Sequence, residues 1–243
     1  YGVSMILNLI LLGFFFVLSL INPVFAEPSC DLDLEKEKLY RLDLTVPATF
    51  CFFQSNDPSC KVFPKKSILQ LHGLWPNYKK GFPEGSCDPS ECKSQSEKLG
   101  KFCKYPEPSG LYNSKEWKKL SEFMAGKEKC LERHEWVKHG VCSPLDPVSY
   151  FSWALERTQD IANAFESLAD KTVGKQEVDA LIASKLPKLN GAVRFSCKGD
   201  NVSSVYILYE WGNQPGNPIK TKGGQNGYGN CPKQFTFPSK PNE

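Results

Sequence analysis

The sequence of 243 residues contains only three histidines, and it lacks several motifs that mark common enzyme classes. It has no Cys-x-x-Cys pair, which argues against a zinc ribbon or a thioredoxin-like redox site. No serine stands in a Gly-x-Ser-x-Gly turn and no cluster of carboxylates suggests a metal site, so we expect no serine nucleophile, no metal and no cofactor. No Gly/Ser-rich or Pro-rich linker divides the chain, and its length favours one domain.

The first 26 residues carry no charged side chain, and residues 6–21 are almost entirely apolar. This run is short for a membrane span and is followed by a proline and the small residue Ala26. We therefore predict a secretory signal peptide over residues 1–26, with an uncleaved anchor as the alternative. The first residue is not methionine, so we expect either further residues upstream or a start at Met5. The domain at 27–243 would then be exported, to the extracellular space or to an endomembrane compartment such as the vacuole.

All ten cysteines follow the predicted cleavage site. An even number of cysteines in an exported chain indicates disulfide bonds, whereas free thiols would be expected in the cytosol. Cys51 and Cys60 bracket a turn and favour a local disulfide, and a bond from Cys197 to Cys231 would tie down the Gly- and Asn-rich segment 212–230. The net charge of +3 is compatible with a polyanionic ligand without requiring one.

Hydrophobic periodicity predicts one α+β domain, in which helices surround a central antiparallel sheet that disulfides cross-link. The predicted strands are residues 40–46, 67–72 and 203–211, and the predicted helices are 114–125, 130–140 and 147–186, the last with a break at Gly174. Pro47 ends the first strand, and Gly73 and Pro76 end the second, so His72 would lie at a strand end. Asn201, in an Asn-Val-Ser triplet beside the third strand, is a candidate glycosylation site.

Two of the three histidines lie in the predicted helix 130–140. At about 100° per residue, four of its ionisable side chains share one side of the helix and Trp136 lies on the other. These ionisable residues are His134, Glu135, Lys138 and His139. The zinc-protease motif needs its histidines one turn apart, and here they are one residue too far apart. A helix with a solvated charged face remains the alternative to acid–base work on a phosphate, but two imidazoles, a carboxylate and an ammonium group together favour the latter.

The third histidine, His72, would complete such a site if it faced Glu135, Lys138 and His139. One imidazole would then remove a proton and the other would supply one. A site without a metal or a covalent nucleophile suits a substrate that brings its own nucleophile. RNA does so through its 2′-hydroxyl group, so we hypothesise that the partner is single-stranded RNA.

Two segments resemble the active-site segments of the ribonuclease T2 family, in the same order and at a plausible separation. They are His72-Gly73-Leu74-Trp75-Pro76 and His134-Glu135-Trp136-x-Lys138-His139-Gly140-x-Cys142. The resemblance extends more loosely over residues 39–240. It implies a disulfide from the Cys87 region to Cys142, beside the Cys51–Cys60 and Cys197–Cys231 pairs.

The resemblance also implies a role for each residue. His139 would act as general base on the 2′-hydroxyl, and His72 as general acid on the departing 5′-oxygen. Glu135 and Lys138 would stabilise the charge on the pentacoordinate phosphorus, and His134 would help to hold the phosphate. The first product would be a 2′,3′-cyclic phosphate, which is then hydrolysed to a 3′-phosphate.

Trp75 would either stack on a bound base, with little sequence preference, or lie in the core beneath the site. The chain departs from the family pattern at three places. Leu131-Glu132 replaces the usual Phe-Trp, Thr45-Val46 replaces Gln-Trp before a proline, and Val141 replaces a threonine. None of these residues transfers a proton, so we expect an active endoribonuclease with low base specificity and altered substrate binding.

The alternative function is a ribonuclease-like protein with weak or no activity that serves storage, defence or pistil recognition. The retention of His72, Glu135 and His139 argues against it. Within the enzyme hypothesis, the positive charge favours a pistil-type member and the intact His-Glu-Trp favours an ordinary one. In either case we expect a monomer with no stable protein partner and no membrane attachment after cleavage of the signal.

Overall fold

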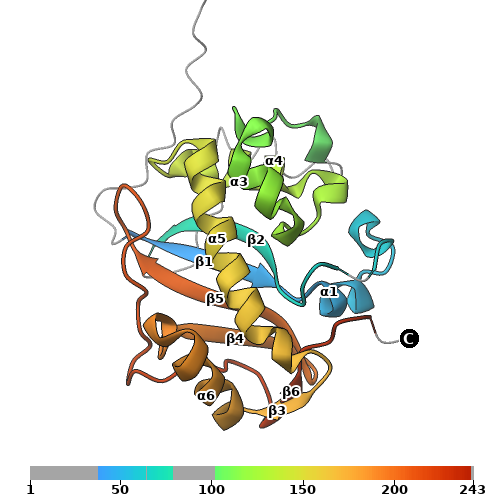
Figure 1. Cartoon of the computed structure of the whole chain (residues 1–243), viewed down its shortest axis with the longest axis vertical. Helices are drawn as coiled ribbons and strands as arrows, with labels where there is room; N and C mark the ends of the chain where they lie inside the picture. The colour runs from blue at the N-terminus through green and yellow to red at the C-terminus, as the bar shows by residue number, and fades with distance from the viewer. Residues whose placement is uncertain (1–37, 64, 79–101, 242–243) are drawn as a thin grey trace, which may run out of the picture.

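The computed structural model describes residues 38–63, 65–78 and 102–241 (Figure 1). These residues form a six-stranded sheet in the order β2-β1-β5-β6-β3, with β4 also paired to β5. Helices surround the sheet, so the predicted α+β fold is confirmed. The predicted signal peptide at 1–26 lies outside the described residues.

The centre of the sheet consists of β1 (Lys38–Thr45), β2 (Gln70–Tyr78), β4 (Val193–Lys198) and β5 (Asn201–Glu210), all paired antiparallel. The strands predicted at 40–46 and 203–211 are thus confirmed. β3 (Thr172–Gly174) and β6 (Gln234–Thr236) extend the sheet, and together with β4 they were not predicted. β6 meets β5 in a single parallel pair.

The prediction for the second strand was wrong at both ends, because β2 begins at Gln70 and runs through Gly73 and Pro76. β2 is an edge strand, where proline is tolerated because one side of the strand makes no ladder bonds. Asp43 of β1 pairs with Gly73, and the next residue, Leu44, pairs with Leu71. This register shift is a β-bulge that leaves His72 without a partner on β1. His72 therefore lies within the strand, at a bulge of the kind that turns a side chain toward a site.

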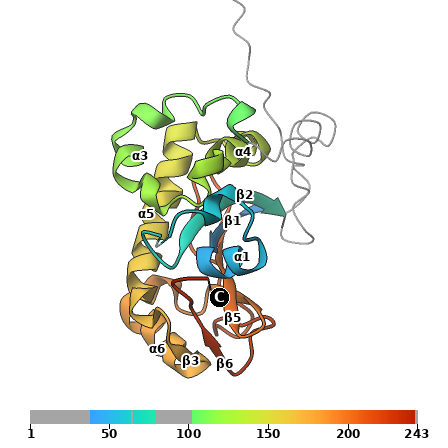
Figure 2. The same ribbon diagram turned by 90° about the vertical axis from the view of Figure 1, so that its right-hand side faces the viewer.

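The longest helix, α5 (Pro147–Phe165), crosses one face of the sheet (Figures 1 and 2). Its start has Pro147 in the first turn, and the backbone N–H of Ser149 donates to the carboxylate of Asp146 at 3.0 Å. The helix predicted at 147–186 was wrong in its middle part, because a 3-10 turn at Glu166–Leu168 and the strand β3 separate α5 from α6 (Lys175–Lys185). α6 does begin directly after Gly174, where the break was predicted. No helix in the described part of the chain is long and apolar enough to cross a membrane.

Three shorter helices complete the helical part of the described chain. α3 (Lys115–Leu120), capped by Ser114, is shorter than predicted because the chain continues as a 3-10 turn. α4 (Leu131–Lys138) confirms the helix predicted at 130–140. α1 (Pro47–Phe53) was not predicted, although Pro47 does end β1. Short 3-10 turns connect these elements: η1 (Pro58–Cys60), η2 (Phe102–Lys104), η3 (Leu111–Asn113), η4 (Ser121–Phe123), η5 (Lys127–Lys129), η6 (Gly140–Cys142), η7 (Glu166–Leu168) and η8 (Pro187–Leu189).

Disulfide bonds join elements that are distant in the sequence. The predicted Cys51–Cys60 and Cys197–Cys231 bonds are both confirmed. A further bond, Cys103–Cys130, was not predicted, and it joins η2 to the start of α4. Cys142 is also disulfide-bonded, but Cys87 lies outside the described residues, so the pairing of these two regions stays a prediction.

Candidate active site

The edge strand β2 and the helix α4 bring the predicted catalytic side chains together. His72 comes from β2 and Glu135 from α4, and His139 directly follows the last residue of α4. The Nε2 atom of His72 lies 3.7 Å from Oε1 of Glu135, and the Nε2 atom of His139 lies 3.9 Å from Oε2. Both imidazoles thus approach one carboxylate, each at its own oxygen.

Glu135 is almost completely buried, and its carboxylate is held by β2. The indole N–H of Trp75 donates to Oε2 of Glu135 at 2.7 Å. Gly73 allows this approach, because a Cβ atom there would collide with the Glu135 carboxylate and the Trp75 indole. Burial raises the pKa of Glu135, although the charge of His72 and the Trp75 hydrogen bond oppose this effect.

Trp75 lies beside both imidazoles, with its ring centroid 5.1 Å from that of His72 and 5.2 Å from that of His139. Its ring is half-buried, so it is not a core tryptophan beneath the site. Stacking of Trp75 on a base stays a prediction. Trp136 does occupy the core, edge-on to Tyr150, as the helical pattern predicts.

His72 has a second acidic neighbour, because its Nδ1 atom lies 3.7 Å from Oδ1 of Asp43. Desolvation lowers the pKa of His72, but the interactions with Asp43 and the charge of Glu135 exceed that effect and raise it overall. Asp43 is buried and also accepts a hydrogen bond at 2.9 Å from Nε of Arg41. The protonated form of His72 is therefore favoured.

His139 has the opposite electrostatic environment. It follows the last residue of α4 and is buried, so desolvation, together with the positive charge of Lys138, holds the pKa of His139 well below its usual range. His139 is therefore neutral near pH 7 and able to accept a proton. The two histidines thus differ in the way that a general acid and a general base must differ.

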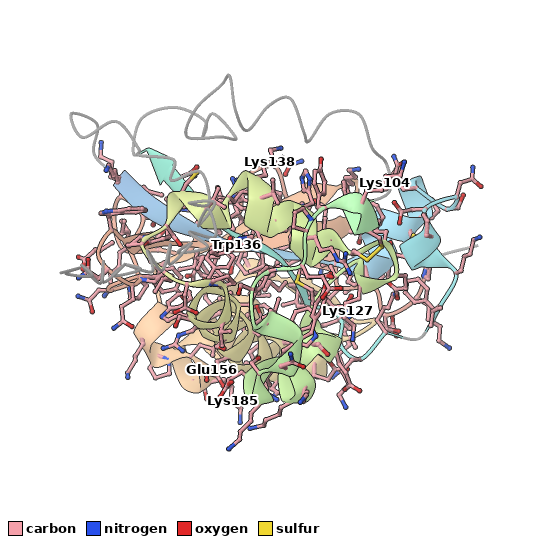
Figure 3. All side chains as sticks on the ribbon, turned by 90° about the horizontal axis from the view of Figure 1, so that it is seen from above. Lys104, Lys127, Trp136, Lys138, Glu156 and Lys185 are labelled. Atoms are coloured by element: carbon pink, nitrogen blue, oxygen red, sulfur yellow. A yellow bond between two sulfur atoms is a disulfide. The ribbon has the colours of Figure 1, made fainter. Side chains whose placement is uncertain are left out.

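His134 lies one helical turn before Lys138, and its ring centroid is 4.5 Å from that of Phe102. Burial, with the charge of Lys138, lowers the pKa of His134 to about 4. His134 is therefore uncharged near pH 7 and would hold a ligand by hydrogen bonding, not by charge. Lys138 lies at the edge of the molecule in Figure 3, whereas Trp136 lies within it.

Two of the residues that depart from the family pattern are in the core. Val46 is fully buried. Glu132 is also buried, and the phenolic O–H of Tyr112 donates to its Oε1 at 2.6 Å. Arg133 fixes the same part of α4, since its guanidinium donates to the carbonyl oxygens of Cys103 and Tyr105 at 3.2 and 3.1 Å. Glu132 and Arg133 therefore attach α4 to the segments around η3 and η2.

A cavity of about 200 Å³ opens beside His72, His134 and Glu135. Leu131 lines it, so this departure does alter the surface that a substrate would meet. The other side chains that line it are mainly aromatic, polar or basic: Thr45, Phe50, Gln70, Phe102 and Lys129. The cavity can therefore accept a planar, partly polar group next to His72 and Glu135.

A metal centre is not indicated in the part of the chain that the structure describes. No group of three or more His, Cys, Asp or Glu side chains there could hold a metal ion. The catalytic arrangement that the described residues do form is a pair of imidazoles flanking one carboxylate.

The sequence analysis missed Asp43 and the cavity. The only signal for Asp43 was an acidic residue between the core residues Leu42 and Leu44 of a predicted strand. Its contact with His72 depends on the bulge in β2, which no local pattern predicted.

The described residues thus form a disulfide-linked α+β domain in which two histidines lie beside one buried carboxylate. The model of the Ribonuclease T2 family matches residues 37–212. The chain therefore belongs to the ribonuclease T2 family.

Curated relatives match parts of the chain. Ribonuclease I from Escherichia coli (strain K12) is 34% identical over 155 residues, which cover 56% of this chain and 57% of that protein. Intracellular ribonuclease LX from Solanum lycopersicum is 37% identical over 90 residues, 36% of this chain and 33% of that protein. The chain thus spans little more than half the length of the first relative and a third of the second.

Solved structures resemble the whole domain. RNase NT in complex with 5′-AMP matches with a TM-score of 0.57 and 19% identity, covering 84% of this chain and 99% of that chain. Trichomaglin, described as an S-like ribonuclease, matches with a TM-score of 0.57 and 19% identity, over 84% of this chain and 98% of that chain. At this identity the likeness shows the fold alone.

Proposed function

We propose that this chain is an endoribonuclease that cleaves single-stranded RNA by acid–base transphosphorylation without a metal ion, with low base specificity. The observation that carries the proposal is the pair of imidazoles on opposite oxygens of Glu135. Their pKa values are displaced in opposite directions, that of His72 upward and that of His139 downward. Membership of the ribonuclease T2 family supports the same reaction.

In the first step, neutral His139 removes the proton of the 2′-hydroxyl, and the 2′-oxygen attacks the adjacent phosphorus. The bond from phosphorus to the 5′-oxygen of the next nucleotide breaks, and protonated His72 gives its proton to that oxygen. The products are a 2′,3′-cyclic phosphate and a free 5′-hydroxyl. His139 is now protonated and His72 neutral.

The second step reverses these roles. His72 takes a proton from water, the water oxygen attacks the cyclic phosphate, and His139 returns its proton to the departing 2′-oxygen. The product is a 3′-phosphate, and both histidines regain their starting states. This step needs no group that the first step does not use.

The developing negative charge on phosphorus needs nearby donors. Lys138 supplies a positive charge. Glu135 acts through the imidazoles that it contacts, because its charge raises the pKa of His72 and so keeps that histidine protonated. His134, whose pKa is lowered to about 4, donates one N–H to the phosphate as a neutral imidazole. Trp75 and Gly73 act indirectly, because they position Glu135.

We also propose that the protein is exported through the secretory route and acts as a monomer without a stable protein partner. The disulfides Cys51–Cys60, Cys103–Cys130 and Cys197–Cys231 support an oxidising compartment. Residues 1–26 would be removed as the signal peptide, and Asn201, at the start of β5, is available for glycosylation.

The test is cleavage of a single-stranded RNA by the purified, oxidised protein between pH 4 and 8 in the presence of a chelator. The expected result is cleavage that leaves 2′,3′-cyclic phosphate ends, detected by mass spectrometry, and that is lost in the His72→Ala, His139→Ala double variant. A correctly folded protein that leaves RNA intact at every pH would overturn the proposal.

A further inference from the structure

The large exposed apolar side chains of the described residues gather near one place on the surface. They are Phe52 (46% exposed) and Phe53 (46%) at the end of α1, and Val62 (56%) just beyond η1. The Cys51–Cys60 disulfide ties η1 to α1, so the three side chains belong to one disulfide-linked unit. Exposed apolar side chains that lie together and are rimmed by polar groups are a feature of binding surfaces, whereas single ones are not.

Basic side chains accompany these rings. The Nζ atom of Lys198 lies 4.8 Å from the ring centroid of Phe53. Closer to the active site, the Nζ atom of Lys129 lies 5.2 Å from the ring centroid of Phe50 and 5.7 Å from that of Phe102. Aromatic rings interleaved with lysines are the arrangement that binds single-stranded nucleic acid, because the rings stack on bases and the lysines neutralise phosphates.

The helix α1 carries both residues that line the active-site cavity and the two exposed rings. Phe50 and Cys51 line the cavity, and the next two residues of the same helix are Phe52 and Phe53. In Figure 2, α1 faces the viewer below α4, from which His134 and Glu135 reach the cavity. A strand that fills the cavity and leaves it along α1 would therefore meet these rings next.

The direction of that strand follows from which histidine lines the cavity. His72 does, and it contacts Oε1 of Glu135, whereas His139, which contacts the other oxygen, is not among the lining residues. In the proposed mechanism His72 protonates the departing 5′-oxygen. The cavity is therefore on the side of the nucleotides that follow the cut.

We propose that Phe52, Phe53 and Lys198 form a binding site for single-stranded RNA on the 3′ side of the cleaved bond, beyond the nucleotide in the cavity. The two rings are perpendicular to each other, so one of them stacks on a base while the other packs against its edge, and Lys198 neutralises an adjacent phosphate. This inference rests on the proposed function and adds to it a preference for substrates that extend in the 3′ direction.

The experiment uses DNA oligonucleotides that contain one ribonucleotide, so that the cut is fixed at one bond. One series adds one, two or three nucleotides on the 3′ side of a cleavable dinucleotide, and a second series adds them on the 5′ side. With the oxidised protein, produced with Asn201 unmodified, we expect kcat/KM to rise with 3′ additions by about five- to tenfold per stacked base. A rise of equal size in both series, or no rise, would overturn the proposal.

The Phe52→Ala, Phe53→Ala variant should lose the gain from 3′ extension and keep the kcat/KM of the dinucleotide. The Phe52→Leu, Phe53→Leu variant should lose this gain too, because leucine has no ring face for stacking. Retention of the gain would overturn base stacking.

If a double variant fails to fold, Lys198→Gln provides an independent test. It should lower the slope of log(kcat/KM) against log[salt] by about 0.7 for the 3′-extended substrate alone.

The matched control is Lys222→Gln. Lys222 is exposed and follows Thr221, which bonds to Gly191 at the opposite end of β4 from Lys198. This variant should leave every substrate unchanged, and an effect equal to that of Lys198→Gln would overturn the site. If the unmutated protein cleaves no substrate at all, the proposed function itself fails; if it cleaves all lengths equally, only the present inference fails.

Discussion

His72 and His139 share one carboxylate and yet have pKa values displaced in opposite directions. The difference comes from their other neighbours. His72 has the additional carboxylate of Asp43, whereas His139 is buried and has the ammonium group of Lys138 nearby. The proposed mechanism requires protonated His72 and neutral His139. The pH profile of kcat/KM should therefore rise through a pKa well below 6.5 and fall through one above 6.5.

Asp43→Asn tests the acidic neighbour of His72. Removing this negative charge takes away part of what raises the pKa of His72, so the alkaline limb of the kcat/KM profile should move to lower pH. The acidic limb, which belongs to His139, should stay in place. Asp179→Asn is the matched control, because Asp179 also accepts hydrogen bonds but pairs with Asn226 and Tyr228. An unchanged alkaline limb in Asp43→Asn would exclude Asp43 as the positioning residue of His72.

The strand β2 places three functional features within four residues: the bulge at His72, the close approach at Gly73 and the indole of Trp75. The sequence pattern predicted a strand here and placed His72 in the site. It could not predict the bulge, because proline and glycine ordinarily end a strand, and here the edge position tolerates them. Likewise, α4 was predicted from its periodicity, but its attachment through Cys103–Cys130 depends on contacts far apart in the sequence.

Gly73→Ala should lower kcat/KM by about 100-fold, because the new Cβ atom would displace the Glu135 carboxylate and the Trp75 indole. The measurement is dinucleotide cleavage, with near-ultraviolet circular dichroism to confirm that the variant folds. Gly174→Ala is the matched control, since the nearest atom to its new Cβ would be a backbone oxygen 4.0 Å away. Equal activities of the two folded variants would refute the positioning role of Gly73.

The attachment of α4 to its neighbours gives a prediction for stability. Burial raises the pKa of Glu132 above its ordinary value of 4.5, against the opposing effect of the Tyr112 hydrogen bond. The folded state therefore favours the protonated carboxyl, and stability is lost as the pH rises through the folded-state pKa. Relative to Glu132→Gln, the unmutated protein should thus become progressively less stable from about pH 4.5 upward.

Urea unfolding at a series of pH values measures this difference in the free energy of unfolding. Glu177→Gln, at an exposed position of α6, should show no comparable dependence. A difference between the unmutated protein and Glu132→Gln that stays constant with pH would show that Glu132 does not titrate differently on folding.

At the scale of the whole molecule, the sequence predicted what local patterns determine. The fold class, two central strands, the helices α4 and α5 and two disulfides were all confirmed. The meeting of His72 with His139 was supplied by family resemblance, since it depends on packing between β2 and α4. The cavity was not predicted, because α1, β2, η5 and α4 all contribute to it.

The most direct test of the two-histidine mechanism compares two substrates with different leaving groups. One is a dinucleotide, whose departing 5′-oxygen needs a proton, and the other is a nucleoside 3′-(4-nitrophenyl phosphate), whose leaving group needs none. His72→Ala should lose about 10²- to 10⁴-fold in kcat/KM on the dinucleotide and less than about tenfold on the activated substrate. His139→Ala should lose activity on both. Rescue of His139→Ala by the activated substrate, with His72→Ala impaired on both, would contradict the assignment of acid and base.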